Sequence, residues 1–113
     1  MAQPLPGIAC RINALATHVG QQTVLAALQT KLQKRLEQAG ARVEDAREAC
    51  LLGKTGPAKR KLGKASKALA QFSKTLRSRK AKTVPATLRD ELTGTAGAIG
   101  GDVGLVKLGL VCG

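Results

Sequence analysis

Residues 53–82 read GKTGPAKRKLGKASKALAQFSKTLRSRKAK, a stretch with eleven Lys or Arg, no Asp or Glu, and the only aromatic residue of the chain, Phe72. Its apolar residues recur at steps of three and four, the spacing of one face of an α-helix. They are Leu62, Ala65, Leu69, Phe72 and Leu76. The stretch therefore predicts a helix that runs to about residue 80, with a narrow apolar stripe and a wide basic face.

A second and longer apolar repeat precedes this stretch. Its members step by three or four from Leu25 to Cys50, which predicts one helix over residues 22–52. Gly53 and Pro57 mark the break between the two helices, because glycine favours a helix end and proline suits a first helical turn.

The same periodicity predicts one more helix on each side of this pair. A short N-terminal helix carries Ile8, Ile12, Leu15 and Val19 and ends at Gly20. The last helix begins near Thr83, its expected cap, and has Asp90 and Glu91 in its early turns, where the helix dipole favours acids. Its apolar residues are Leu88, Leu92, Ala96, Ile99, Val103, Val106 and Leu110.

Composition agrees with a helical fold. The chain of 113 residues is long enough for one core. Hydrophobic residues make up 43% of the chain and aromatic residues only 1%, which indicates a core of Leu, Ala, Val and Ile. No alternating run predicts a strand, and no apolar run is long enough for a membrane span. Because short connections join long helices, neighbouring helices should run in opposite directions. We predict an all-α fold: one antiparallel bundle over residues 1–113, with three long helices, a short N-terminal one, and flexible ends at 1–6 and 112–113.

Glycine is frequent in the last predicted helix, where each residue costs about 1 kcal/mol relative to alanine. The glycines are Gly94, Gly97, Gly100, Gly101, Gly104 and Gly109. Either this helix packs very closely on a neighbour or its end frays. Close packing is favoured over a nucleotide-binding loop, because the glycines do not spell G-x-G-x-x-G and no strand precedes them.

Motifs for catalysis, cofactors or metals are not recognisable in this sequence. Gly53, Lys54 and Thr55 match the end of a phosphate-binding loop, but Glu48 stands where that motif requires glycine. With His18 the only histidine, expected at a helix end, the sequence predicts neither an enzyme nor a cofactor or metal site.

Three cysteines allow at most one internal disulfide. In an up-down-up bundle Cys50 and Cys112 end two helices at the same end, so they are the favoured pair, with Cys10 left over. The other interpretation is three reduced cysteines in a cytosolic protein.

The basic face of the helix at 57–80 is the candidate functional surface. Arg60, Lys67 and Lys74 recur every seven residues opposite the apolar stripe, with Lys64 and Arg77 at the flanks. With a net charge of +12 they predict contact with a polyanion, whereas the plainer interpretation is a solvated face. Nucleic-acid binding would be independent of base sequence, because no stacking aromatic or base-reading motif is present.

Three segments carry a resemblance to a known family: INALATHV, LAALQTKLQKRLEQA and KRKLGKASKALAQFSKTLRSRKAKTVPATLRDEL. The pattern, over roughly residues 8–106, resembles the FIMAH-like helical modules at the C-termini of large secreted bacterial proteins. Phe72 in one helix, the basic end at 77–82, and Val84 and Pro85 before the next helix are its core. The glycine-rich last helix and the high positive charge depart from the family pattern.

The resemblance implies a non-catalytic accessory module of a larger extracellular or cell-surface polypeptide, with a role in contact with acidic polysaccharide. We therefore expect a polyanion-binding module, with a purely structural tail or spacer and a non-sequence-specific nucleic-acid-binding protein as the alternatives. A cytoplasmic location would follow if the cysteines are reduced.

Overall fold

The computed structural model describes residues 5–25, 27–78, 81–82 and 84–112. These residues form four α-helices, α1 (Leu5–Gly20), α2 (Ala27–Leu51), α3 (Thr55–Leu76) and α4 (Ala86–Gly109), with a short 3-10 helix η1 (Thr23–Leu25) before α2. The described residues contain no strand, which confirms the predicted all-α class. Within this part of the chain, none of the helices is long and apolar enough to cross a membrane.

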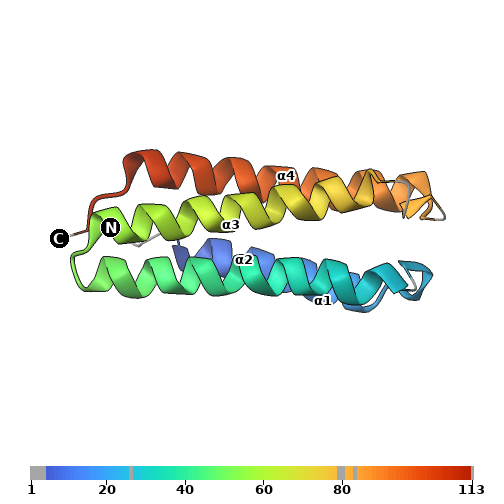
Figure 1. Cartoon of the computed structure of the whole chain (residues 1–113), viewed down its shortest axis with the longest axis horizontal. Coiled ribbons are helices and arrows are strands. Elements are labelled where there is room, and N and C mark those ends of the chain that lie inside the picture. The colour runs from blue at the N-terminus through green and yellow to red at the C-terminus, as the bar shows by residue number, and fades with distance from the viewer. Residues whose placement is uncertain (1–4, 26, 79–80, 83, 113) are drawn as a thin grey trace.

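The helices pack side by side into an elongated bundle of 47 × 20 × 20 Å (Figure 1). α1 packs mainly against α2 and α4, and α3 against the same two helices, so each helix has two principal neighbours around one core. The colour gradient in Figure 1 turns back after α2 and again after α3. This places the end of α2, the start of α3 and the end of α4 together at one end of the bundle.

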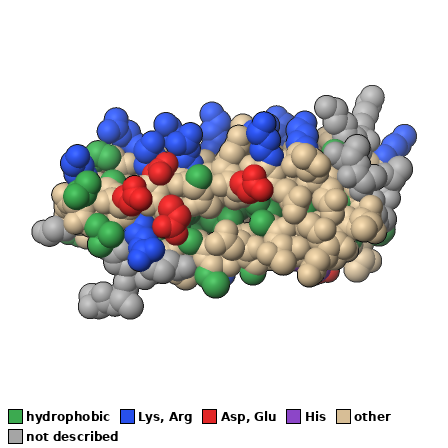
Figure 2. Space-filling model, turned by 90° about the horizontal axis from the view of Figure 1, so that it is seen from below, with side chains coloured by type: hydrophobic (Ala, Val, Ile, Leu, Met, Phe, Trp, Pro, Cys, Tyr) green, Lys and Arg blue, Asp and Glu red, His purple; other side chains and the backbone are tan. Residues whose placement is uncertain are grey.

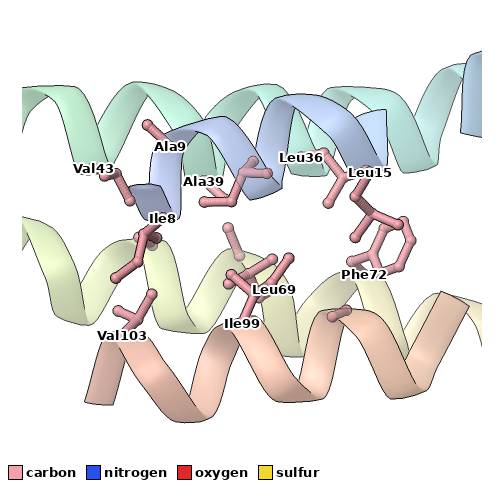
Figure 3. Close-up of a cluster of buried hydrophobic side chains, with 14 of the residues drawn as sticks. Ile8, Ala9, Leu15, Leu36, Ala39, Val43, Leu69, Phe72, Ile99 and Val103 are labelled. Carbon is pink, nitrogen blue, oxygen red and sulfur yellow. The ribbon is translucent and has the colours of Figure 1, made fainter. Parts of the chain in front are cut away.

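The core lies along the axis of the bundle and receives side chains from all four helices. Figure 3 shows Ile8 and Leu15 from α1, Leu36 and Val43 from α2, Leu69 and Phe72 from α3, and Ile99 and Val103 from α4. All five members of the predicted α3 stripe are buried, and Phe72 is fully so. The apolar periodicity of the sequence therefore identified the core correctly.

Two helix boundaries differ from the prediction. The segment predicted as one helix from residue 22 is divided into η1 and α2, because the side-chain amide of Gln29 donates to the carbonyls of Val19 (3.1 Å) and Gly20 (2.8 Å) and fixes a turn there. Helix α3 ends at Leu76, well before residue 80, where the Ser78 hydroxyl donates to the Thr75 carbonyl at 2.6 Å. Such a local bond competes with helix continuation.

The break between α2 and α3 forms as predicted. Gly53 has a φ of +74°, its N–H donates to the Cys50 carbonyl, and the N–H of Lys54 donates to the Ala49 carbonyl. These two bonds close a Schellman motif, which needs a residue in the left-handed region. Pro57 then lies in the first turn of α3.

The start of α4 differs from the prediction in its cap. Pro85 occupies the capping position and makes no side-chain bond there. Thr83, the expected cap, lies outside the described residues.

The predicted disulfide is present. Cys50 at the end of α2 and Cys112 after α4 form a bond with a Cα–Cα distance of 4.8 Å, and Cys10 is exposed as a free thiol. Cys112 does not belong to a flexible end as predicted: it is buried, and its N–H donates to the Thr55 hydroxyl oxygen at 2.9 Å. The disulfide and this hydrogen bond hold the segment that follows α4 onto the rest of the bundle.

Close packing through the glycines of α4, one of the two alternatives for their number, is wrong. A Cβ added at Gly94, Gly97, Gly101, Gly104 or Gly109 would meet no atom within 4 Å, and one at Gly100 would only touch Leu69. The helix nevertheless continues to Gly109, because Leu92, Ala96, Ile99 and Val103 on its opposite face are buried. Tertiary packing therefore outweighs the poor helix propensity of the exposed face.

Alanine at these exposed positions should stabilise the protein. The variants Gly97→Ala and Gly101→Ala are expected to raise the free energy of unfolding by about 0.5 to 1 kcal/mol each, because alanine loses less backbone entropy and has room for its Cβ. Urea denaturation measures the change. Gly53→Ala is the matched control and should destabilise, since its φ is positive. Unchanged or lower midpoints for the two α4 variants would show that α4 is not helical at these positions.

Candidate functional site

The predicted basic row lies on the solvent side of α3. Arg60, Lys64, Lys67 and Lys74 are exposed within the helix, and Arg77 is exposed at its C-cap. The buried stripe fixes this orientation. Arg60, Lys67 and Lys74 are seven residues apart, about two helical turns, so they share the face of α3 that points away from the core. Among the described residues, no cation of α3 forms an ion pair, so its positive charge is not locally neutralised.

A groove between α2 and α3 runs beside this row and collects cations from both helices. It consists of two adjoining hollows of about 250 and 300 Å³ that share Gln71. The first is lined by Gln38, Arg42, Lys64, Lys67, Ala68 and Gln71, and the second by Lys31, Arg35, Gln71, Lys74, Thr75 and Ser78. We call this surface, with its six cations Lys31, Arg35, Arg42, Lys64, Lys67 and Lys74, the α2/α3 groove.

Most polar side chains that line the groove are hydrogen-bond donors. Arg35 donates to the side-chain oxygen of Gln38 at 3.3 Å, and Arg42 lies 3.4 Å from Asp45, one turn along α2. That exposed ion pair is weakly held, because both side chains are more than 40% exposed to water. The Thr75 hydroxyl donates to the backbone carbonyl of Gln71, one turn earlier in α3, at 2.9 Å. A ligand in the groove would therefore meet positive charge and N–H donors, which suits an anion.

Charge is distributed unevenly around the bundle. Helices α1 and α4 carry three cations and three acids: Arg11, Arg89, Lys107, Asp90, Glu91 and Asp102. Arg11 pairs with Asp102 across these two helices, and His18 lies 3.1 Å from Glu91. The net charge of +12 therefore resides on α2, α3 and the connecting segments.

Figure 2 shows the result on the surface. Lys and Arg side chains gather along the upper edge of the molecule in Figure 2. This edge is the side of the bundle that is nearest the viewer in Figure 1, where α2 and α3 lie. Asp and Glu side chains lie on the adjoining face. One long side of the bundle is thus strongly basic.

The sequence predicts only part of this site. Lys64, Lys67 and Lys74 line the groove, whereas Arg60 and Arg77 lie on α3 outside it. The contributions of α2 were missed. Lys31, Arg35 and Arg42 recur at steps of four and seven, so the same periodicity placed them on one face, but the sequence did not show that this face adjoins the basic side of α3.

The segment that imitates a phosphate-binding loop has a structural role. The Thr55 hydroxyl donates to the carbonyl of Cys112 at 3.3 Å and accepts from its N–H at 2.9 Å. Thr55 thus joins the start of α3 to the end of the chain. His18 lies in the last turn of α1 as expected. Over the described part of the chain, no three His, Cys, Asp or Glu side chains cluster as metal ligands would.

Comparison of the chain with protein-family models, with curated proteins and with solved structures found no match.

Proposed function

We propose that this chain is a non-catalytic accessory module, built as an antiparallel helical bundle, that binds an acidic polysaccharide or other polyanion along its basic side. The observation that carries the proposal is the α2/α3 groove, where six cations from two helices line one continuous surface. A linear polyanion laid along the groove would contact several of them at once and release its condensed counterions.

The chemistry favours binding without base or sequence readout. The chain has no Trp or Tyr, and its only Phe is fully buried in the core, so no aromatic platform can stack bases. Four of the six groove cations are lysines, which act as point charges and recognise charge density better than a particular group.

An extracellular site of action belongs to the same proposal. A disulfide between Cys50 and Cys112 is compatible with an oxidising compartment, and FIMAH-like modules of secreted bacterial proteins combine this setting with a larger parent polypeptide. The rival functions are a spacer without a ligand and a non-specific nucleic-acid-binding protein.

Retention on heparin and on duplex DNA as a function of salt separates these functions. A polyanion-binding module is expected to remain bound to heparin above about 0.15 M salt, because several charge contacts survive that concentration. Elution from both columns below it would leave the spacer as the function, and markedly stronger retention on DNA would favour the nucleic-acid function. Charge reversal at Arg60, Lys67 and Lys74 is the control: unchanged retention would place the binding surface elsewhere.

A further inference from the structure

The exposed large apolar side chains of the described residues all lie toward one end of the bundle. They are Leu51 (69% exposed), Leu52 (71%), Leu105 (68%), Leu108 (81%) and Val111 (83%). They belong to the end of α2, the last turns of α4 and the segment after it. Soluble proteins seldom gather exposed apolar residues in this way unless the surface contacts a partner or a membrane.

One disulfide and two hydrogen bonds join the segments at this end of the molecule. Leu51 directly follows Cys50 and Val111 directly precedes Cys112, so the disulfide brings the two apolar segments together. Thr55 exchanges two hydrogen bonds with Cys112. We call Leu51, Leu52, Leu108 and Val111 the apolar tip. Its side chains are largely exposed to water.

Positive charge surrounds the apolar tip. Within about two helical turns of this end, α2, α3, α4 and the turn between α2 and α3 carry six cations and four acids. The cations are Arg47, Lys54, Lys59, Arg60, Lys61 and Lys107, and the acids are Glu44, Asp45, Glu48 and Asp102. Three of these acids are already paired: Glu44 with Arg47, Asp45 with Arg42, and Asp102 with Arg11. Lys54 is exposed in the turn beside Leu52. The end of the bundle therefore presents a small apolar area within a basic rim.

The apolar tip and its basic rim together indicate which kind of binding partner fits this surface. A second copy docking end to end would bring two basic rims together, which opposes association. A soluble polyanion would satisfy the rim and leave the leucines in water. An anionic lipid bilayer satisfies both, because its headgroups attract the cations while its acyl boundary takes up the apolar side chains.

We propose that the apolar tip docks end-on at the surface of an anionic lipid bilayer, with Leu51, Leu52 and Val111 inserted into the interfacial region and Lys54 among the headgroups. This site lies at the end of the bundle and is separate from the α2/α3 groove along its side. The groove stays accessible to a soluble polyanion when the tip is inserted.

A single-tryptophan reporter tests the insertion, since the chain has no Trp of its own. The variant Leu52→Trp is mixed with vesicles of phosphatidylcholine containing about one quarter phosphatidylserine, and with vesicles of phosphatidylcholine alone. Its emission is expected to shift to the blue with the anionic vesicles only. Gln21→Trp, an exposed position in the connection between α1 and η1, is the matched control and should not shift.

Other outcomes overturn the proposal in recognisable ways. Sedimentation with anionic vesicles without a shift of Leu52→Trp means that the basic side binds and the tip does not insert. A shift on heparin alone identifies a soluble polyanion as the occupant. A shift that depends on protein concentration without vesicles identifies a second copy, and an equal shift with neutral vesicles removes the role of charge.

A second variant separates this site from the proposed function. Leu51→Ser, Leu52→Ser and Val111→Ser together should lower the apparent affinity for anionic vesicles by at least about tenfold, because three apolar side chains lose their burial. Retention on heparin should not change. If the triple variant binds vesicles with unchanged affinity, the tip is not the docking site. If the wild-type protein is not retained on heparin, the proposed polyanion function is wrong, and the proposal for the tip is unaffected.

Discussion

Replacement of Cys50 and Cys112 by alanine is expected to lower the free energy of unfolding by about 4 kcal/mol. The disulfide joins residues 62 positions apart, so it removes much of the freedom of the unfolded chain between α2 and the end of α4. It also holds Cys112 against Thr55, which ties the end of the chain to α3. Urea denaturation of the wild-type protein, with and without reductant, and of the double variant measures the effect.

The thiol count provides the control for this prediction. The native protein should contain one reactive thiol, that of Cys10, and three only after reduction and unfolding. Three reactive thiols in the native protein would contradict the disulfide and remove the support for an extracellular setting. A difference below about 1 kcal/mol between oxidised and reduced protein would show that the loop is already restricted in the unfolded state.

Removal of three charges from the α2/α3 groove is expected to weaken heparin binding at low salt on the order of 100-fold. The variant is Arg35→Gln, Lys67→Gln and Lys74→Gln, all of which line the groove. Glutamine keeps much of each side chain's length and polarity, so the fold should be retained while the charge contacts are lost. Fluorescence anisotropy with a labelled heparin fragment measures the dissociation constant.

A matched variant separates a local site from net charge. The variant with Lys82→Gln, Arg89→Gln and Lys107→Gln also removes three positive charges, from positions that do not line the groove. Its affinity should fall much less, because charges far from the ligand are screened at ordinary ionic strength. Equal losses in the two variants would mean that the protein binds through its overall charge and has no localised site.

The core was predictable from the sequence because its signal is local. The steps of three and four from Leu62 to Leu76 and from Leu25 to Cys50 determine which face of each helix is buried, whatever its neighbours are. The pairing of Cys50 with Cys112 followed from the order of up and down helices, since both cysteines end a helix at the same end.

The structural features that the sequence did not predict depend on contacts between different helices. The amide of Gln29 divides the predicted second helix by capping the end of α1, a contact that no periodicity reveals. Most glycines of α4 face water because of how α4 sits on α1 and α3, and the sequence did not specify that placement. The groove combines Lys31 and Arg35 with Lys74 across two helices, so the row on α3 alone was an incomplete description of the basic side.

The salt dependence of heparin binding tests the central claim, a localised polyanion site in the α2/α3 groove, most directly. The logarithm of the association constant should fall linearly with the logarithm of salt concentration in all three proteins. The slope of the groove variant should be smaller in magnitude than the wild-type slope by about three, which is about one for each contact removed. The matched variant should keep the wild-type slope. Indistinguishable slopes in the wild-type protein and the groove variant would contradict the claim.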